Sequence, residues 1–286
     1  MFSCSKKIPI PDFDAEKAWS HLIAQCDFGA RTPGSKAHGD CLVYISNELQ
    51  KVGAKVSLQR FSEKLPFNPE PVSCANIIAS FGEKKRRRIL LCAHWDTRPW
   101  ADQDAVALNR SKPVPGANDG ASGVAVLLEV ARHLNKVEPQ YGVNIIFFDA
   151  EDSGQPNQTD FALGSRYFAK HKSPNYHPEF GILLDMVGDA DLQVYQEVNS
   201  VKYAKRFVDR VWQKAAELNL PSFRKTARFQ VEDDHIPLLE SGIPCIDLID
   251  FDYPYWHSTE DTPDKCSPQS LGEVGQLILN LLYAEG

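Results

Sequence analysis

The chain has 286 residues, of which 43% are hydrophobic and 24% charged, an ordinary composition for a folded globular protein. Its net charge of −7 argues against a general phosphate-binding surface, so we expect no nucleic-acid partner. No apolar run is long enough to span a bilayer. The length suits one large α/β domain, and we expect a tail over residues 1–13 followed by a single domain over 14–286.

The first residues leave the location of the protein open. Residues 1–7 lack the apolar stretch of a signal peptide, so the protein is cytoplasmic unless an export signal has been removed. With such a signal it would be periplasmic or extracellular, and Cys4 would be compatible with a lipid anchor. The seven cysteines include no Cys-x-x-Cys pair, so no structural zinc site of the cysteine type is expected.

Hydrophobic periodicity predicts alternating helices and strands. In chain order these are helices at 14–26 and 37–51, strands at 55–61, 75–81 and 88–93, a helix at 121–135, a strand at 144–148, a helix at 161–171, strands at 180–185 and 192–195, a helix at 200–218, a strand at 246–249 and a helix at 271–282. Residues 99–115 form a long polar loop, which residues 98–100 are expected to fix in place. Phe161 and Phe168 are at helical spacing and are expected in the core.

This order of elements predicts a three-layer α/β/α sandwich around a central mixed, mostly parallel twisted sheet. The strand at 88–93 is apolar from Ile89 to Ala93, as expected of a strand covered on both faces. The strands at 55–61, 75–81 and 88–93 follow one another without a helix, so part of the sheet should be antiparallel.

Acidic and imidazole side chains follow the ends of the predicted strands. They are His94 and Asp96, Asp152, Asp185 and His257, while Asp119 lies on the glycine-rich turn 116–123 before a helix. An α/β sheet gathers its site at the carboxyl ends of its strands. Zinc binds carboxylate oxygen and imidazole nitrogen, and a catalytic zinc keeps one position open. We therefore expect a metal site with Asp119 as the central ligand, although any one of these residues could merely cap a loop.

Glu151 stands beside Asp152, and adjacent residues on an extended chain point in opposite directions. One side chain can therefore bind the metal while the other remains free to act as a general base. The plainer alternative is one ligand and one surface acid. Asp149 precedes both residues and could support a ligand from behind.

The turn 116–123 lacks the Gly-Lys-Ser/Thr ending of a phosphate loop and the Gly-x-Gly-x-x-Gly spacing of a dinucleotide site. Its glycines are better explained by close approach of the backbone to a ligand. No Gly-x-Ser-x-Gly sequence is present, which argues against a serine hydrolase of the nucleophile-elbow type.

Taken together, these segments resemble the zinc-aminopeptidase superfamily. They are His94-Trp95-Asp96, the turn Gly116 to Gly123, Phe148 to Asp152, Leu184 to Gly188 and Trp256 to Thr259. Within it, the segment Glu232 to Pro237 and the pair Trp256-His257 resemble glutaminyl cyclases of the animal-like type that also occurs in bacteria. The resemblance runs in order from about residue 15 to the end of the chain.

The resemblance implies one zinc ion held by Asp119, Asp152 and His257, with Glu151 as general base and acid. It further implies that Asp185 and Asp233 form an acid network beside Glu151, that Trp256 walls the substrate pocket, and that the Asp119–Gly120 peptide bond is cis. Two residues depart from the animal enzymes: Asp152 replaces a Glu and Glu232, near the substrate amine, replaces a Gln. The implied substrates are peptides or proteins with amino-terminal glutamine, and the implied state is a monomer.

Two other interpretations remain open. A two-zinc aminopeptidase of the same superfamily would use His94, Asp119, Asp152, Asp185 and His257, all of which are present. The ligand inventory therefore does not separate it from a cyclase, and His94 remains a candidate second-metal residue. A binding module that had kept the fold but lost its activity would be expected to lack Glu151 or a ligand, and none is missing.

Overall fold

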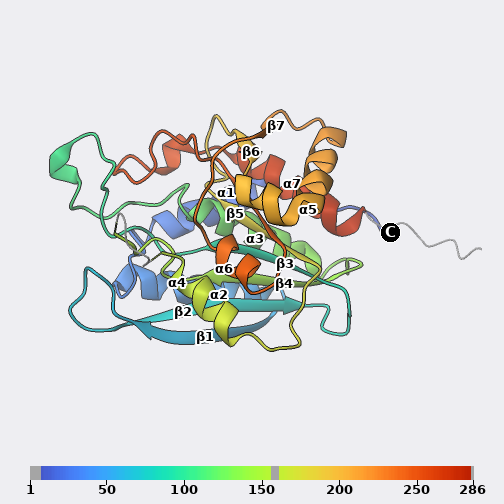
Figure 1. Cartoon of the computed structure of the whole chain (residues 1–286), viewed down its shortest axis with the longest axis horizontal. Coiled ribbons are helices and arrows are strands. Elements are labelled where there is room, and N and C mark those ends of the chain that lie inside the picture. Colours follow the sequence, from blue (N-terminus) through green and yellow to red (C-terminus); the bar gives the residue numbers. More distant parts are fainter. Residues whose placement is uncertain (1–7, 156–160, 285–286) are drawn as a thin grey trace, which may run out of the picture.

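The computed structural model describes residues 8–155 and 161–284, and a six-stranded sheet with helices on both faces forms its centre (Figure 1). The strands lie in the order β1 (Lys55–Glu63), β2 (Val72–Phe81), β4 (Gly142–Phe148), β3 (Arg88–His94), β5 (Phe180–Asp185) and β8 (Cys245–Ile249). The pairs β4–β3, β3–β5 and β5–β8 are parallel, whereas β1–β2 and β2–β4 are antiparallel. The predicted mixed, mostly parallel sheet is thus confirmed. Residues 1–7, with Cys4, lie outside the described part of the chain.

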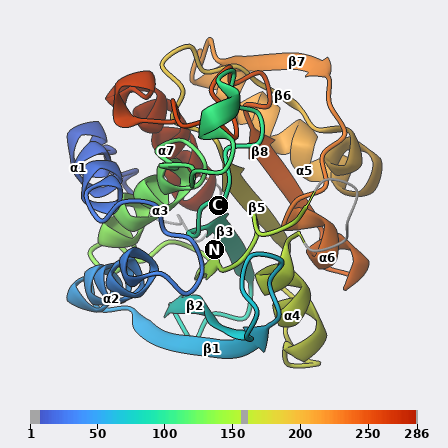
Figure 2. The ribbon, with the colours of Figure 1, turned by 90° about the vertical axis from the view of Figure 1, so that its left-hand side faces the viewer.

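Two helical layers cover the sheet, as Figure 2 shows in end view. The helices are α1 (Ala15–Cys26), α2 (Lys36–Lys51), α3 (Ala121–Leu134), α4 (Leu163–His171), α5 (Val198–Glu217), α6 (His235–Glu240) and α7 (Pro268–Tyr283). On β3, Ile89 and Leu91 pack into the larger core with α1, α3 and α7, while Leu90 and Cys92 pack into a smaller core with α4 and α6. The continuous apolar run of this strand is therefore explained by cover on both faces.

The register of the parallel strands brings their polar ends to one edge of the sheet. His94 at the end of β3 pairs with Phe148 at the end of β4, so the residues after β4 begin beside His94. Asp185 at the end of β5 pairs with Ile249 at the end of β8. Side chains that are far apart in sequence are thus collected where an open α/β sheet binds its ligands.

One β-strand and one α-helix were not predicted. The strand β7 (Phe223–Ala227), which pairs with β6 (Val194–Gln196), exposes every residue after Phe223 and so shows no alternation of buried and exposed positions. The helix α6 is only six residues long and contains Pro237, so it gives little helical periodicity. In the described part of the chain, no helix combines the length and apolar character that a membrane crossing requires.

Phe161 was wrongly expected in the helical core. The backbone at Ala162 is left-handed, with φ of 54°, and α4 begins only at Leu163. Phe161 therefore precedes the helix and lies outside its apolar stripe, whereas Phe168 is buried in the smaller core as expected.

Candidate metal centre and active site

Asp119 is placed by a glycine-rich turn that is tied to the rest of the site from two sides. The carboxylate of Asp261 accepts hydrogen bonds from the backbone amides of Asn118, at 2.9 Å, and of Asp119, at 3.2 Å. Asp261 also accepts a 2.8 Å hydrogen bond from the hydroxyl of Tyr253. On the other side, the Asn118 side chain accepts a 2.7 Å hydrogen bond from the backbone amide of Gly188, just beyond β5. The Asp119–Gly120 peptide bond is cis, as the resemblance implied.

The glycines of this turn allow close approach within the protein rather than to a ligand. A Cβ at Gly120 would lie 2.3 Å from Nε2 of His94, and one at Gly123 would lie 2.2 Å from the carbonyl oxygen of Leu184. Neither position could therefore hold a larger residue without moving His94 or the start of α3 away from β5. The expectation that these glycines face a ligand is corrected by these contacts.

Asp119 belongs to two groups of residues that could each hold a metal ion. In the first, Nε2 of His94 lies 3.0 Å from Oδ1 of Asp119 and 3.2 Å from Oδ1 of Asp185. In the second, Nε2 of His257 lies 3.3 Å from Oδ1 of Asp152 and 3.7 Å from Oδ2 of Asp119. The two oxygens of one carboxylate thus face two different imidazoles.

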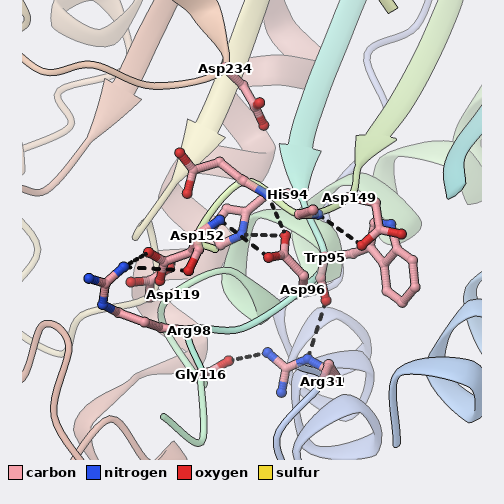
Figure 3. Close-up of polar contacts among 12 residues, drawn as sticks. Arg31, His94, Trp95, Asp96, Arg98, Gly116, Asp119, Asp149, Asp152 and Asp234 are labelled. Carbon is pink, nitrogen blue, oxygen red and sulfur yellow. Dashed lines mark hydrogen bonds and ion pairs between the residues drawn. The ribbon is translucent and has the colours of Figure 1, made fainter. Parts of the chain in front are cut away.

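The segment after β4 is held by Asp96 (Figure 3). The two carboxylate oxygens of Asp96 accept hydrogen bonds from the backbone amides of Glu151, at 3.0 Å, and Asp152, at 3.2 Å. Ala150 just before them has a positive φ of 54°, so the chain turns where the strand ends. The sequence allowed Asp149 to support a ligand from behind. Its carboxylate instead contacts His38 and the backbone amide of Ala75 in the interior. Asp96 is therefore the residue that positions the Glu151–Asp152 pair.

Arg98 is buried beside Asp152 of the second ligand group (Figure 3). No sequence pattern indicated this position. Its Nη1 donates a 2.7 Å hydrogen bond to Oδ1 of Asp152. Its Nε donates a 2.8 Å hydrogen bond to Oδ1 of Asp102, and its Nη2 donates one of 2.8 Å to Oδ2. Asp102 in turn lies 3.5 Å from Nδ1 of His257. The predicted role of residues 98–100 in fixing the loop is thus incomplete, because Arg98 also contacts Asp152 and its partner Asp102 contacts His257.

A cavity of about 60 Å³ lies over the second ligand group. Its walls include every predicted site residue except His94. These residues are Asp119, Glu151, Asp152, Asp185, Glu232, Asp233, Trp256 and His257. The remaining lining is apolar and comprises Phe161, Met186, Val231, Ile249 and Phe251. The cavity opens into a hollow of about 390 Å³ that shares Phe161, Phe251 and Trp256 with it. The site is therefore a small acidic chamber with an aromatic mouth.

The aromatic residues at the mouth are packed together. The rings of Trp256 and His257 are stacked with centroids 3.8 Å apart, and Phe251 lies 5.1 Å from Trp256. This packing fixes the plane of the imidazole and shields one side of the chamber from water. Phe251 and Phe161 were not predicted as site residues, since no motif contains them.

Buried carboxyl groups surround Glu151 in the chamber. Burial, followed by the negative charges of Asp233 and Asp152, raises the pKa of Glu151 well above its ordinary value. Burial and the charge of Asp185 raise the pKa of Asp233 to about 7. Close carboxyl groups in a low-dielectric site hold protons that exposed groups would lose, so this cluster is suited to accepting and returning a proton.

Behind Asp233, His235 is buried between two further carboxyl groups. Its Nε2 lies 3.3 Å from Oε2 of Glu197, and its Nδ1 lies 3.7 Å from Oδ2 of Asp247. Glu197 caps α5 by accepting hydrogen bonds from the amides of Asn199 and Ser200. Although burial opposes it, the hydrogen bonds and charge of His235 together with these amides lower the pKa of Glu197 to about 2. Asp233, His235 and Asp247 form a further group whose ligand atoms could hold a metal ion, and this cluster was not predicted.

Comparison with known proteins gives three related findings. A curated glutaminyl-peptide cyclotransferase from Boiga irregularis is 26% identical, over 87% of this chain and 75% of the relative. The solved structure of Tannerella forsythia glutaminyl cyclase is 41% identical with a TM-score of 0.92, covering 96% of this chain and 100% of that one. A structure described as a Zn-dependent exopeptidase from Parabacteroides distasonis is 36% identical with a TM-score of 0.94, covering 97% and 100%.

These similarities confirm the resemblance to bacterial glutaminyl cyclases and the fold that it implied. The model of peptidase family M28 matches residues 76–282, which include every residue of both ligand groups. The chain belongs to peptidase family M28.

Proposed function

We propose that this protein is a glutaminyl-peptide cyclotransferase, which closes the amino-terminal glutamine of peptides or proteins to pyroglutamate and releases ammonia. The observation that carries the proposal is the small chamber in which Glu151 faces the Asp119–Asp152–His257 group under a wall of Trp256. The similarity to several glutaminyl cyclases supports the same activity. The proposed substrates are chains with amino-terminal glutamine, and the protein is proposed to act as a monomer.

We assign one zinc ion to the group of Asp119, Asp152 and His257. The donor set of two carboxylates and one imidazole is typical of a catalytic zinc site that keeps a position open. Oδ2 of Asp152 is buried and has no hydrogen-bond partner within the described residues, which a metal ion would supply. Arg98 occupies Oδ1 of the same carboxylate, so the two oxygens have different partners.

The geometry of the His94 group favours a single ion. Nε2 of His94 already contacts Asp119 and Asp185 at hydrogen-bond distance, and the chamber is not lined by His94. In the proposed site His94 therefore acts as a hydrogen-bond partner that orients Asp119. The other oxygen of Asp119, Oδ2, then remains available to the zinc site formed with Asp152 and His257.

The bound zinc would supply Lewis-acid polarisation of the side-chain amide oxygen of the substrate glutamine. In the reaction, the α-amine nitrogen forms a bond to the side-chain amide carbon, and the bond from that carbon to the amide nitrogen breaks. Glu151 accepts a proton from the attacking amine and returns it to the departing nitrogen, which leaves as ammonia. No water is consumed, so the aromatic mouth would favour cyclisation by excluding it.

The other chamber residues are proposed to position the substrate and the base. Asp185 and Asp233 lie beside Glu151 and would hold its carboxyl group in the orientation needed for proton transfer. Trp256 would pack against the glutamine side chain. Glu232 is exposed at the rim of the chamber and would hold the substrate amine as it enters.

One pair of assays separates this function from an aminopeptidase of the same family. The purified protein is incubated with a glutaminyl dipeptide amide and, separately, with an amino-acid anilide. Ammonia release from the dipeptide without cleavage of the anilide is the expected result. Anilide cleavage without ammonia release would replace the proposal with a peptidase function.

A further inference from the structure

A third hollow, of about 530 Å³, adjoins the active site at Glu232. It lies between α5 and α6 and is bounded on the site side by Gln230 and Glu232. Both residues also line the mouth of the chamber, and Glu232 lines the chamber itself. A chain that leaves the active site past Glu232 therefore enters this hollow, which we call the α5–α6 groove.

The walls of the groove combine free carboxylates with an apolar floor. Glu232 and Glu240 are exposed, and neither carboxylate has a hydrogen-bond or ion-pair partner within the described residues. The apolar surface comes from Ile236, Leu239 and Pro244, and the ring of Tyr203, which is 59% exposed, borders it. The lining contains no lysine or arginine. The nearest cation in sequence, Lys202, lies over the ring of Tyr203 with its Nζ 4.7 Å from the centroid.

The two carboxylates of the groove differ from the exposed acids of α5, which have basic partners. On α5 itself, Asp209 contacts Lys205 and Glu217 contacts Lys214. The groove thus offers the free carboxylate of Glu240 beside apolar side chains, with Glu232 adding negative charge at its active-site end. Lysine and arginine match both features, since they lay an apolar stem along a surface and present a charge at its end.

The position of the groove sets which substrate residue reaches it. From His235 to Glu240, α6 advances about 7.5 Å, which an extended peptide crosses in two to three residues of about 3.3 Å each. With glutamine in the chamber and the second residue at the aromatic mouth, the third and fourth residues lie along α6.

We propose that the α5–α6 groove is a binding subsite for the third or fourth residue of the substrate peptide and that it prefers lysine or arginine there. The inference rests on the proposed function, because it assumes that the glutamine occupies the chamber. It extends that function by naming a substrate class, namely peptides with a basic residue shortly after the amino-terminal glutamine.

The test compares ammonia release from amidated tetrapeptides that differ only at positions three and four. Gln-Ala-Arg-Ala and Gln-Ala-Ala-Arg are compared with the matching glutamate peptides and with the dipeptide Gln-Ala. We expect kcat/KM to be about three- to tenfold higher for the better arginine peptide than for its glutamate counterpart, mainly through KM. The difference should shrink at high salt, since the groove is open to solvent.

The variant Glu240→Lys should reverse the preference, and Glu240→Gln should reduce it about threefold, while turnover of Gln-Ala stays unchanged. Glu217→Gln is the matched control, because it removes one charge from the far end of α5, about 21 Å along the helix from Tyr203. Equal kcat/KM for the arginine and glutamate peptides, or an unaltered preference in Glu240→Lys, would overturn the inference alone. Ammonia release from none of the peptides, Gln-Ala included, would instead reject the proposed function and the subsite with it.

Discussion

The two candidate metal groups that contain Asp119 differ in what surrounds them. The imidazole of His94 is 1% exposed and sits at 3.0 and 3.2 Å from two carboxylate oxygens. The imidazole of His257 has longer contacts of 3.3 and 3.7 Å, lines the chamber and is stacked on Trp256. The two groups are equal in their ligand inventory, but of the two imidazoles only that of His257 lines the chamber. Exposure of the imidazole to the chamber, rather than the number of ligands, distinguishes the two groups.

The largest effect should come from removing one imidazole or the other. His257→Ala is expected to lower the zinc affinity and the rate of ammonia release by at least about 100-fold, because it removes a proposed ligand. His94→Ala should retain about one equivalent of zinc, even if its turnover falls. Metal analysis after dialysis measures both, and equal loss of zinc from the two variants would show that the groups do not differ as described.

Glu151→Gln sharpens the comparison by testing the chamber without changing either group. The variant keeps the shape of the side chain but removes its ability to accept a proton. We expect stoichiometric zinc with ammonia release reduced about 10²- to 10⁴-fold. Turnover close to that of the unaltered protein would remove Glu151 from its proposed role.

Substitution of Arg98 tests how Asp152 is held, and Asp152 belongs only to the group of Asp119, Asp152 and His257. Arg98→Lys keeps the positive charge but cannot donate to both Asp152 and Asp102 in the fork geometry of a guanidinium. We expect zinc affinity, measured by competition with a chelator, to fall about 10- to 100-fold.

Arg87→Lys is the control for that measurement, because Arg87 is an exposed arginine whose carboxylate partner, Glu179, is far from the site. If Arg98→Lys and Arg87→Lys bind zinc equally well, Arg98 does not position Asp152.

The smallest effect concerns the buried pair of Glu197 and His235, which belongs to neither of the two groups that contain Asp119. The pKa of Glu197 is about 2 in the folded chain, against an ordinary value of 4.5. A lowered folded pKa stabilises the protein above pH 4.5, and the contribution is lost as the pH falls from about 5 to about 2. At pH 7 it corresponds to about 3 kcal/mol of the free energy of unfolding.

Denaturant unfolding of Glu197→Gln should therefore show a loss of about this size at pH 7 and a smaller loss at pH 3. Glu217→Gln serves as the control, since this residue is exposed at the other end of α5. An equal loss at both pH values would show that the charge of Glu197 does not contribute in this way.

Sequence patterns could predict the parts of this protein that repeat a simple rule. The polar residues after strand ends predicted that His94, Asp152 and Asp185 would lie close together, and the register of the parallel strands brings those ends together. The glycine-rich turn predicted that Asp119 would join them. The apolar run of β3 correctly predicted a strand covered on both faces.

The sequence could not predict the residues that support the site from a distance. Asp261 holds the Asp119 turn across 142 positions of sequence, and Arg98 reaches Asp152 across 54. No local pattern records such contacts, because they depend on how two loops fold back over the sheet. The interior pairing of His38 with Asp149 is hidden for the same reason. The one signal available for Arg98 was its place two positions after Asp96 in the segment that begins His94-Trp95-Asp96.

The most direct test of the account is a zinc titration of the metal-free protein followed by ammonia release from Gln-Ala amide. The account predicts that activity rises in proportion to added zinc and reaches its maximum at one equivalent per chain. A maximum reached only at two equivalents, or full activity before any zinc is added, would contradict it.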